Sequence, residues 1–266
     1  MNPMHDRHSN KRRYFSEQGT TTKKYIIPYV EKVMTINTET RVLEIGCGEG
    51  GNLMPFLELG CEAIGVDLHA KQIERAKIFT IEDIPEAKVK FLNENIYNLT
   101  IEEIGKFDLI MLKDVIEHIP NQEKFMGHLK QFLKPQGKVF FGFPPWRMPF
   151  GGHQQVCKSK LLSKLPYFHL LPKPIYKLIL KAFKVHPSNV KELLEIKSTG
   201  ISIRRFENIV KTNNYRIAQK TYFLINPNYE IKFGLKPKEQ IGLIAVIPYF
   251  KDFFTTCVYC IIENQN

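Results

Sequence analysis

Six consecutive residues, 46–51, carry the clearest chemical pattern in this chain, because four of them are glycines. Glycines permit a tight turn and let a ligand approach the backbone closely. Asp67 follows about 20 residues later, the distance at which an acid in a nucleotide-binding unit accepts hydrogen bonds from ribose hydroxyls. The pattern therefore predicts a site for a ligand that contains a ribose.

Apolar runs on both sides of the glycines indicate which elements hold this site. Residues 42–45 are typical of a buried strand, and residues 52–59 of a helix in which Pro55 falls in the tolerant first turn. Residues 63–66 form a second apolar run that ends on Asp67. Strand, glycine loop, helix, strand and acid in this order are one half of a doubly wound α/β sheet.

Two cofactors fit this unit. Gly46, Gly48 and Gly51 satisfy the spacing of a nicotinamide-dinucleotide site. Gly46, Gly48 and Gly50 are instead preceded by Glu44, and in this acid-x-Gly-x-Gly-x-Gly pattern the chain resembles the class I S-adenosylmethionine (SAM) methyltransferases. Glu44 favours SAM, because a carboxylate would repel a pyrophosphate, whereas SAM carries a sulfonium and an amino group and no phosphate.

The resemblance implies roles for individual residues. Glu44 supports the glycine loop or binds the SAM amino group, and Asp67 holds the ribose hydroxyls. Asn95 stands where many relatives have an Asp beside the adenine, and its side-chain oxygen can still accept a hydrogen bond from an amine. Lys113 occupies the position whose backbone meets the methionine end. The implied cofactor residues are Glu44, Gly46, Cys47, Gly48, Gly50, Asn52, Asp67, Leu68, Asn95, Ile96 and Lys113.

A second motif concerns the methyl transfer itself. Residues 113–121, KDVIEHIPN, resemble the segment after strand four in a subset of small-molecule methyltransferases. His118 lies in this segment near the methionine end, and His153 lies in a region that covers the substrate in resembling enzymes. An imidazole can accept a proton from a hydroxyl near neutral pH, but the displacement depends mainly on positioning. For both histidines a structural role stays open.

The remaining pattern predicts a Rossmann-like α/β fold. Helices are expected at 20–34, 70–80, 122–133, 202–213 and near 239–246, strands at 88–92, 107–112, 138–143, 215–226 and 253–263, and a turn at 134–137. The resemblance implies a doubly wound, seven-stranded, mostly parallel sheet with the last strand antiparallel. We expect an N-terminal arm and capping helix (1–40), with Tyr14 and Phe15 as candidate walls of the cofactor pocket. A SAM-binding domain (41–146 and 197–266) and a helical lid after strand five (147–196) complete the chain.

Positive charge is concentrated in the expected lid. The chain has a formal charge of +11, and residues 151–200 contain nine lysines, two acids and no arginine. Residues 174–183 predict a helix with an apolar stripe, Ile175, Leu178 and Ile179, and lysines elsewhere on its surface. Such a helix either packs on the domain as a lid or rests on an anionic membrane surface. Lysines without arginine are a poor nucleic-acid surface, so we expect no nucleic-acid partner.

Composition and cysteine content indicate the cellular compartment. No apolar run approaches the 18 or so residues that span a bilayer, and the polar, basic N-terminus is not a secretory signal. Five cysteines, an odd number, indicate reduced thiols and a cytoplasmic protein, with peripheral membrane contact left open. Cys257 and Cys260 fall in an expected strand and point to opposite faces, so we expect neither redox chemistry nor a metal.

These observations predict an enzyme, a SAM-dependent methyltransferase with S-adenosylhomocysteine as its product. The acceptor is expected to be a hydroxyl on a small apolar, lipid-like or glycan molecule. A protein or RNA amino-methyltransferase is disfavoured, because Leu112-Lys113-Asp114-Val115 stands where that class has an Asn-Pro-Pro-Tyr motif. An NAD(P)-dependent oxidoreductase and a non-catalytic SAM-binding or membrane-surface protein remain as alternatives.

Overall fold

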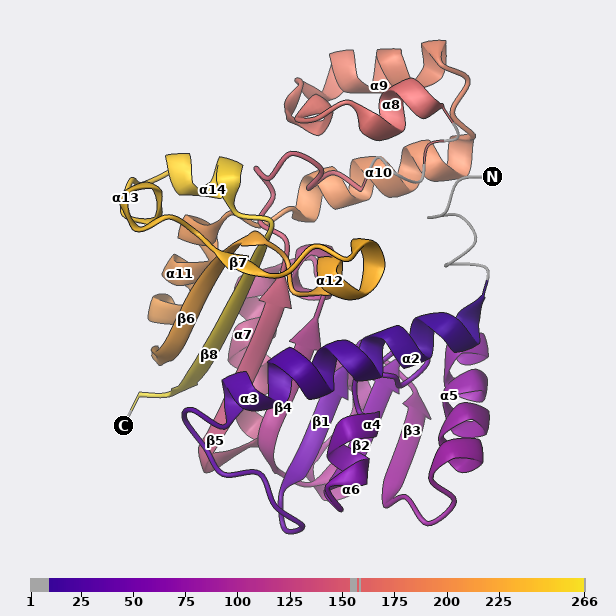
Figure 1. Cartoon of the computed structure of the whole chain (residues 1–266), viewed down its shortest axis with the longest axis vertical. Helices are drawn as coiled ribbons and strands as arrows, with labels where there is room; N and C mark the ends of the chain where they lie inside the picture. Colours follow the sequence, from indigo (N-terminus) through magenta and orange to yellow (C-terminus); the bar gives the residue numbers. More distant parts are fainter. Residues whose placement is uncertain (1–9, 154–156, 158, 266) are drawn as a thin grey trace.

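One twisted sheet organises the protein, and helices cover both of its faces (Figure 1). The computed structural model describes residues 10–153, 157 and 159–265. The sheet has eight strands in the order β3-β2-β1-β4-β5-β8-β6-β7. In chain order these are β1 (Arg41–Ile45), β2 (Glu62–Asp67), β3 (Val89–Asn93), β4 (Phe107–Lys113), β5 (Leu133–Phe143), β6 (Tyr215–Ile225), β7 (Lys238–Glu239) and β8 (Cys257–Asn264).

Strands β1 to β5 are parallel, and β8 runs antiparallel to both β5 and β6. This is the predicted Rossmann-like class with an antiparallel last strand. The predicted strand number, seven, was one too low, because the two-residue β7 pairs with β6 at the sheet edge. The turn expected at 134–137 was also wrong, since these residues belong to β5, whose pairing with β4 shifts register between Phe107 and Leu109.

One face of the sheet is covered by the N-terminal helix together with α4 (Met54–Glu58) and α5 (Ala70–Asp83). The N-terminal helix consists of α2 (Lys11–Thr21), a π-helical turn, η1 (Thr22–Ile26), and α3 (Ile27–Val30). It begins earlier than the expected 20–34, because the Asn10 side chain caps α2 and Phe15 is buried in the core of this face.

The opposite face is covered by α6 (Ile101–Ile104), α7 (Gln122–Leu129) and α11 (Ile203–Thr212), with 3-10 turns η2 (Ile96–Asn98), η3 (Ile116–His118) and η4 (Lys130–Phe132). Helix α11 buries Ile203, Phe206, Ile209 and Val210, a helical spacing that places one apolar stripe on the sheet. Phe206 packs edge-on against Phe141 of β5, with ring centroids 5.0 Å apart. The sheet therefore has a separate apolar core on each face.

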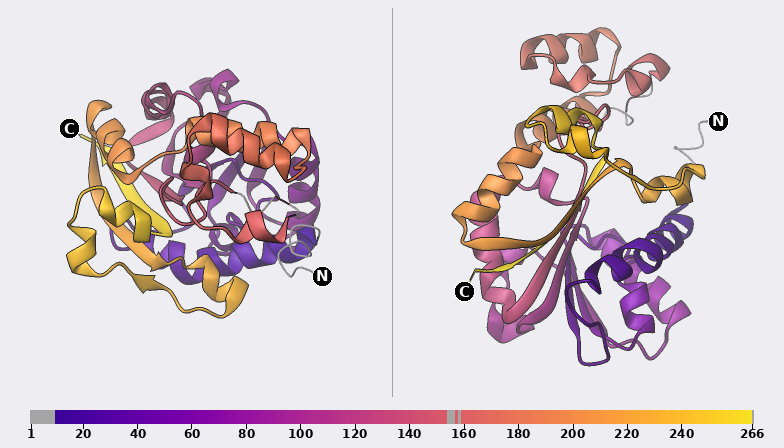
Figure 2. Two further views of the ribbon diagram at one scale, coloured as in Figure 1. Left: turned by 90° about the horizontal axis from the view of Figure 1, so that it is seen from above. Right: turned by 60° about the vertical axis from the view of Figure 1, so that its left-hand side comes forward.

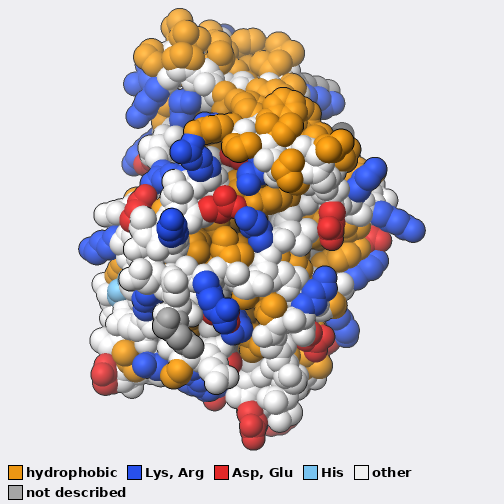
Figure 3. Space-filling view, turned by 90° about the vertical axis from the view of Figure 1, so that its left-hand side faces the viewer, with side chains coloured by type: hydrophobic (Ala, Val, Ile, Leu, Met, Phe, Trp, Pro, Cys, Tyr) orange, Lys and Arg blue, Asp and Glu red, His pale blue; other side chains and the backbone are white. Residues whose placement is uncertain are grey.

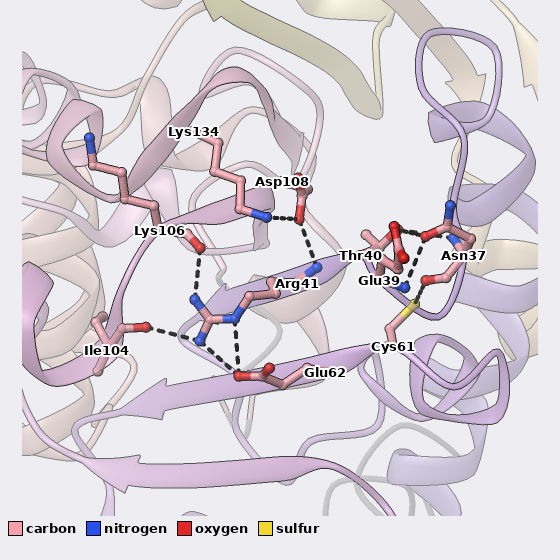
Figure 4. Close-up of polar contacts among 10 residues, drawn as sticks. All are labelled: Asn37, Glu39, Thr40, Arg41, Cys61, Glu62, Ile104, Lys106, Asp108 and Lys134. Carbon is pink, nitrogen blue, oxygen red and sulfur yellow. Dashed lines mark hydrogen bonds and ion pairs between the residues drawn. The ribbon is translucent and has the colours of Figure 1, made fainter.

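Polar contacts tie the strands together at the amino ends of β1 and β4 (Figure 4). The Arg41 guanidinium donates to the Glu62 carboxylate of β2 at 2.7 Å and to the carbonyl of Lys106 at 2.8 Å. The Asp108 carboxylate accepts from the backbone N–H of Arg41 at 2.9 Å and from the Lys134 ammonium at 2.7 Å. These bonds hold the strands in register at the end opposite the glycine loop, which leaves the carboxyl ends free for the site.

The insertion after β5 lies beyond the carboxyl ends of the strands and forms the uppermost layer in Figure 1 and the nearest layer in the left view of Figure 2. It contains α8 (Lys160–Lys164), η6 (Phe168–Leu170), α9 (Lys173–Ala182) and α10 (Pro187–Thr199). The expected helix at 174–183 is confirmed by α9, whereas α10 was not anticipated. A small core of its own, including Phe168, Tyr176 and Leu193, holds the insertion together.

Between β6 and β8 the chain makes three short helices, α12 (Asn228–Phe233), α13 (Gly242–Ala245) and α14 (Phe250–Phe254). The expected strand at 253–263 begins only at Cys257, because residues 250–254 are helical. Asp252 of α14 is buried, and its carboxylate accepts from the backbone N–H of Ile203 at the start of α11 at 3.2 Å. This contact joins α14 to α11, two segments that lie far apart in sequence.

Candidate functional site

The glycine loop lies at the carboxyl end of β1 and has the backbone conformation that glycine alone adopts without strain. Gly46 and Gly50 have φ values of +71° and +84°. A Cβ on Gly50 would lie 2.9 Å from the Phe91 ring, closer than packed carbon atoms approach. The backbone N–H of Gly46 donates to the carbonyl of Val66 at 2.8 Å, which joins the loop to β2. The loop is therefore a fixed turn that exposes backbone at the strand end.

Asp67 ends β2 and already contacts this loop. One oxygen of its carboxylate accepts from the backbone N–H of Gly48 at 2.9 Å, and the other accepts from the N–H of His69 at 2.8 Å. The oxygen bonded to the His69 N–H also lies 3.0 Å from the His69 ring nitrogen Nδ1, whereas the oxygen bonded to Gly48 has a further lone pair that can accept from a ribose hydroxyl. Leu68, another predicted cofactor residue, is 66% exposed beside it. His69 was not predicted from the sequence. Its position two residues after Asp67 was the available signal.

Glu44 is fully buried behind the loop, with a relative exposure of 0%. One of its oxygens accepts from the Asn52 side-chain amide at 2.7 Å, and the Asn52 oxygen accepts from the Thr22 hydroxyl at 3.1 Å. Burial raises the pKa of Glu44 to about 8, although the Asn52 hydrogen bond opposes this shift. Its second oxygen has no hydrogen-bond partner among the described residues. Glu44 thus both supports the loop and retains an oxygen that can pair with an ammonium group.

The residues predicted around the adenine lie after β3. The Asn95 side-chain oxygen accepts from the backbone N–H of Tyr97 at 3.1 Å and so caps η2. Ile96 is buried in the core on the α7 side of the sheet. Cys47, predicted beside them, is buried in the other core and is not exposed to solvent.

Lys113 and Asp114 form an ion pair at the carboxyl end of β4. Burial lowers the pKa of Lys113, but the neighbouring Asp114 carboxylate outweighs it, so the net shift is upward. The same pairing outweighs burial for Asp114 and lowers the pKa of its carboxyl. Asp114 was not among the predicted site residues, although an acid directly after strand four was the available signal.

The N-terminal helix and α12 cover this end of the site. A cavity of only about 10 Å³ remains between them, lined by Tyr14 and Gln18 of α2, Asn52, Lys113 and Ile231 of α12, among others. Such a cavity has room for about one water molecule, whereas ligand pockets typically measure about 300–1,000 Å³. The space enclosed between these helices is therefore smaller than a cofactor molecule.

The two covering helices also contact each other. The Lys24 ammonium pairs with the Glu230 carboxylate at 2.9 Å, and this bond joins the N-terminal helix to α12. Tyr14 faces the cavity, as the sequence suggested. Phe15 instead packs against Phe79 of α5 with ring centroids 5.2 Å apart, so it belongs to the core.

The two candidate catalytic histidines come together at the methionine end of the predicted site. The rings of His118 and His153 meet edge-on, with centroids 5.0 Å apart, although they are far apart in sequence. Burial and then the neighbouring His118 lower the pKa of His153 to about 4, against the opposing effect of Asp114. His153 is therefore neutral at physiological pH and has a lone pair available to a proton or an ion.

Cys257 and Cys260 lie in the two apolar cores of the sheet. Cys257 belongs to the core on the α5 side of the sheet and Cys260 to the core on the α7 side. Both are free and buried. The expectation that they point to opposite faces of a strand is confirmed.

Comparisons with known proteins agree with this geometry. Residues 18–155, just over half of the chain, match the family described as Methyltransferase domain. The ubiquinone biosynthesis O-methyltransferase of Rhodopseudomonas palustris (strain BisB5) is 36% identical over 100 residues, which cover 36% of this chain and 37% of that protein. The chain thus spans little more than a third of the length of this curated relative.

Solved structures share the fold over a longer range. Magnesium protoporphyrin IX methyltransferase from Synechocystis PCC 6803, with bound S-adenosylhomocysteine, has a TM-score of 0.55 at 15% identity and covers 96% of this chain and 88% of its own. Geranyl diphosphate C-methyltransferase from Streptomyces coelicolor A3(2), in complex with Mg²⁺, geranyl diphosphate and S-adenosyl-L-homocysteine, has a TM-score of 0.54 at 14% identity. That match covers 91% of this chain and 81% of that one.

The sheet order, the glycine loop and the acid at the end of β2 define the class I SAM methyltransferase fold. The chain belongs to the Methyltransferase domain family. This membership confirms the resemblance drawn from the glycine motif. It also supports SAM, rather than a nicotinamide dinucleotide, as the cofactor.

Proposed function

We propose that this chain is a SAM-dependent methyltransferase whose acceptor is a hydroxyl on a small apolar molecule. The observation that carries the hydroxyl acceptor is the pair His118 and His153, two imidazoles 5.0 Å apart beside Asp114. An imidazole held neutral can receive the proton that a hydroxyl loses during methyl transfer. The names of the curated relatives, O-methyltransferases, support the same acceptor.

In this proposal bound SAM supplies the methyl group, and the residues of the chain position both reactants. Asp67 holds the ribose, Asn95 and Ile96 border the adenine, and the free oxygen of Glu44 pairs with the amino group. Lys113, which is buried, and its partner Asp114, which is partly exposed, border the methionine end. Because the reaction is a direct displacement, alignment of the acceptor oxygen with the methyl carbon contributes most of the rate.

An apolar end of the molecule supports a lipid-like acceptor. Leu178 of α9, Leu243 of α13 and Val246 after it are 68%, 81% and 74% exposed. Figure 3 shows apolar side chains gathered at this end of the molecule. The exposed apolar residues of these segments are Leu161, Leu165, Ile175, Leu178, Phe183, Ile241, Leu243, Val246, Ile247, Tyr249, Phe250 and Phe254. Exposed apolar side chains that gather in this way are typical of an interaction or membrane surface.

Lysines accompany the apolar surface. A hollow of about 480 Å³ between α9 and α10 has an apolar floor that includes Val190 and Leu194, and its rim carries Lys173, Lys177 and Lys181. Apolar side chains with a basic rim fit the interface of an anionic bilayer. We therefore include peripheral contact with an anionic membrane in the proposal, as a route to an apolar acceptor. Among the described residues, no helix combines the length and apolarity needed to cross a bilayer.

Calorimetric titration with S-adenosylhomocysteine, with NAD as the control ligand, tests the cofactor. We expect micromolar binding of the former alone, and binding of NAD alone would overturn the proposal. Transfer of labelled methyl groups from SAM to a hydroxylated aromatic lipid, with its fully O-methylated analogue as a matched control, tests the acceptor. Cofactor binding without turnover on any hydroxyl would favour the non-catalytic alternative.

A further inference from the structure

Glu117, His118 and His153 bring three potential ligand atoms together, all within 4.8 Å of one another. Glu117 and His118 belong to η3, directly after β4, whereas His153 follows β5 and has a left-handed backbone with φ of +53°. The cluster therefore depends on the packing of the insertion's first loop against η3.

Glu117 is the least expected member of this cluster. Its side chain is nine-tenths or more buried, at 3% exposure, and neither carboxylate oxygen accepts a hydrogen bond from another described residue. Burial and the nearby Asp114 carboxylate raise the pKa of Glu117 well above its usual range. Lys113, whose charge acts on Glu117, is already paired with Asp114. A buried carboxylate without a partner is costly, and a cation opposite it would remove that cost.

The two imidazoles complete the ligand set. The His118 side chain is exposed and the His153 side chain is half-buried, and each offers one ring nitrogen to the cluster. Desolvation lowers the pKa of both rings, which keeps them in the neutral form that binds metals.

We propose that Glu117, His118 and His153 form a site for a divalent transition-metal ion of the Zn²⁺ type. Two nitrogens and one carboxylate oxygen suit Zn²⁺, Mn²⁺ or Fe²⁺ better than Mg²⁺ or Ca²⁺, which favour oxygen ligands alone. Bonds of about 2.0–2.2 Å require the ligands to move together by about 1 Å. Three protein ligands leave a coordination position open, as in catalytic rather than structural sites.

The open position gives the ion a role in methyl transfer, and this part of the inference rests on the proposed hydroxyl acceptor. An ion there would hold the acceptor oxygen and lower the pKa of its hydroxyl. The proton leaves to solvent, the oxygen forms its bond to the methyl carbon, and the carbon–sulfur bond breaks to give S-adenosylhomocysteine. With an ion bound, the two histidines act as its ligands and the ion activates the hydroxyl; without an ion, they accept the proton as proposed above. The sequence pattern alone predicted no metal ligand.

Zinc binding to the metal-free full chain tests the site without reference to turnover. After removal of metals with a chelator, we expect calorimetry with Zn²⁺ to give one equivalent, and Co²⁺ to give visible absorption bands typical of nitrogen and oxygen ligation. Glu117→Gln, His118→Ala and His153→Ala should each weaken Zn²⁺ binding by about tenfold or more. His186→Ala is the matched control, because His186 is an exposed histidine at the start of α10.

Parallel titration with S-adenosylhomocysteine separates this inference from the proposed function. Each variant should bind it as the unaltered chain does, which also shows that the variant is folded. His153→Ala is the safest variant to fold, because its side chain is only half-buried on a loop. Zinc binding that is absent from the unaltered chain, or unchanged in all three variants, would overturn the metal site while leaving the cofactor site intact. Loss of S-adenosylhomocysteine binding in the unaltered chain would instead overturn the proposed function.

Discussion

The glycine-loop edge and the helical insertion position their functional groups by different means. At the edge, the groups come from segments close together in sequence, and backbone geometry at strand ends orients them, as in the 2.9 Å bond between Gly48 and Asp67. In the insertion, His153 meets His118 only because two distant segments pack together. The first region should therefore tolerate little change in its backbone. The second should respond mainly to changes in side chains.

The largest expected effect is on the cofactor and concerns Asp67. Asp67→Ala should weaken S-adenosylhomocysteine binding by about 2–4 kcal/mol, because two hydrogen bonds from ribose to a charged acceptor are lost. Calorimetric titration checks this. The control is Glu86→Ala, which removes an exposed acid outside the site. Equal affinities in the two variants would mean that the ribose lies elsewhere.

The next largest expected effect concerns the backbone of the glycine loop. Gly50→Ala should lower the free energy of unfolding by about 1–3 kcal/mol, because alanine at φ +84° is strained and its Cβ would meet Phe91. Urea denaturation measures the loss. Gly242→Ala in α13 is the matched control, because a Cβ there has no neighbour within 4 Å. If both variants unfold at the same urea concentration, the loop is not the rigid element of this comparison.

A side-chain test in the insertion should affect turnover and leave cofactor binding unchanged. His153→Ala is expected to reduce kcat by about tenfold to a hundredfold, whether the imidazole accepts a proton or holds an ion. Because the pKa of His153 is lowered to about 4, its neutral form is lost only as the pH falls through 4. The kcat of the unaltered chain should therefore show no inflection from this group near pH 6.5. Full activity in His153→Ala would make His153 a structural residue.

The smallest expected effect concerns the lysines of the insertion. Lys177→Gln should weaken binding to anionic vesicles by about 1 kcal/mol, roughly fivefold, because one basic side chain is lost from the interface. Co-sedimentation with vesicles that contain phosphatidylglycerol measures the change, and pure phosphatidylcholine vesicles give the baseline. Lys211→Gln, on α11 outside the insertion, removes the same charge as a control. Failure of the unaltered chain to bind either vesicle would leave α9 as a lid only.

The strand–glycine loop–strand unit and the segment after β4 were predictable because their signals are local. Apolar runs bounded by glycines identified β1 and β2, and Asp67 followed at the required spacing. Helix α10 and the late start of β8 were not predictable, because both depend on tertiary contacts. One such contact is the Asp252 carboxylate accepting from Ile203. The eighth strand was missed because two residues are too few to show a pattern.

The sequence by itself determined the fold class, the family and the groups at the strand ends, because periodicity and glycine spacing act over a few residues. Only the tertiary structure decided that α2 and α12 leave a cavity of about 10 Å³ beside Lys113. It alone also brought the unpaired Glu117 carboxylate together with the two imidazoles. Packing decides both features, since it joins residues more than thirty positions apart whose separation no local pattern encodes.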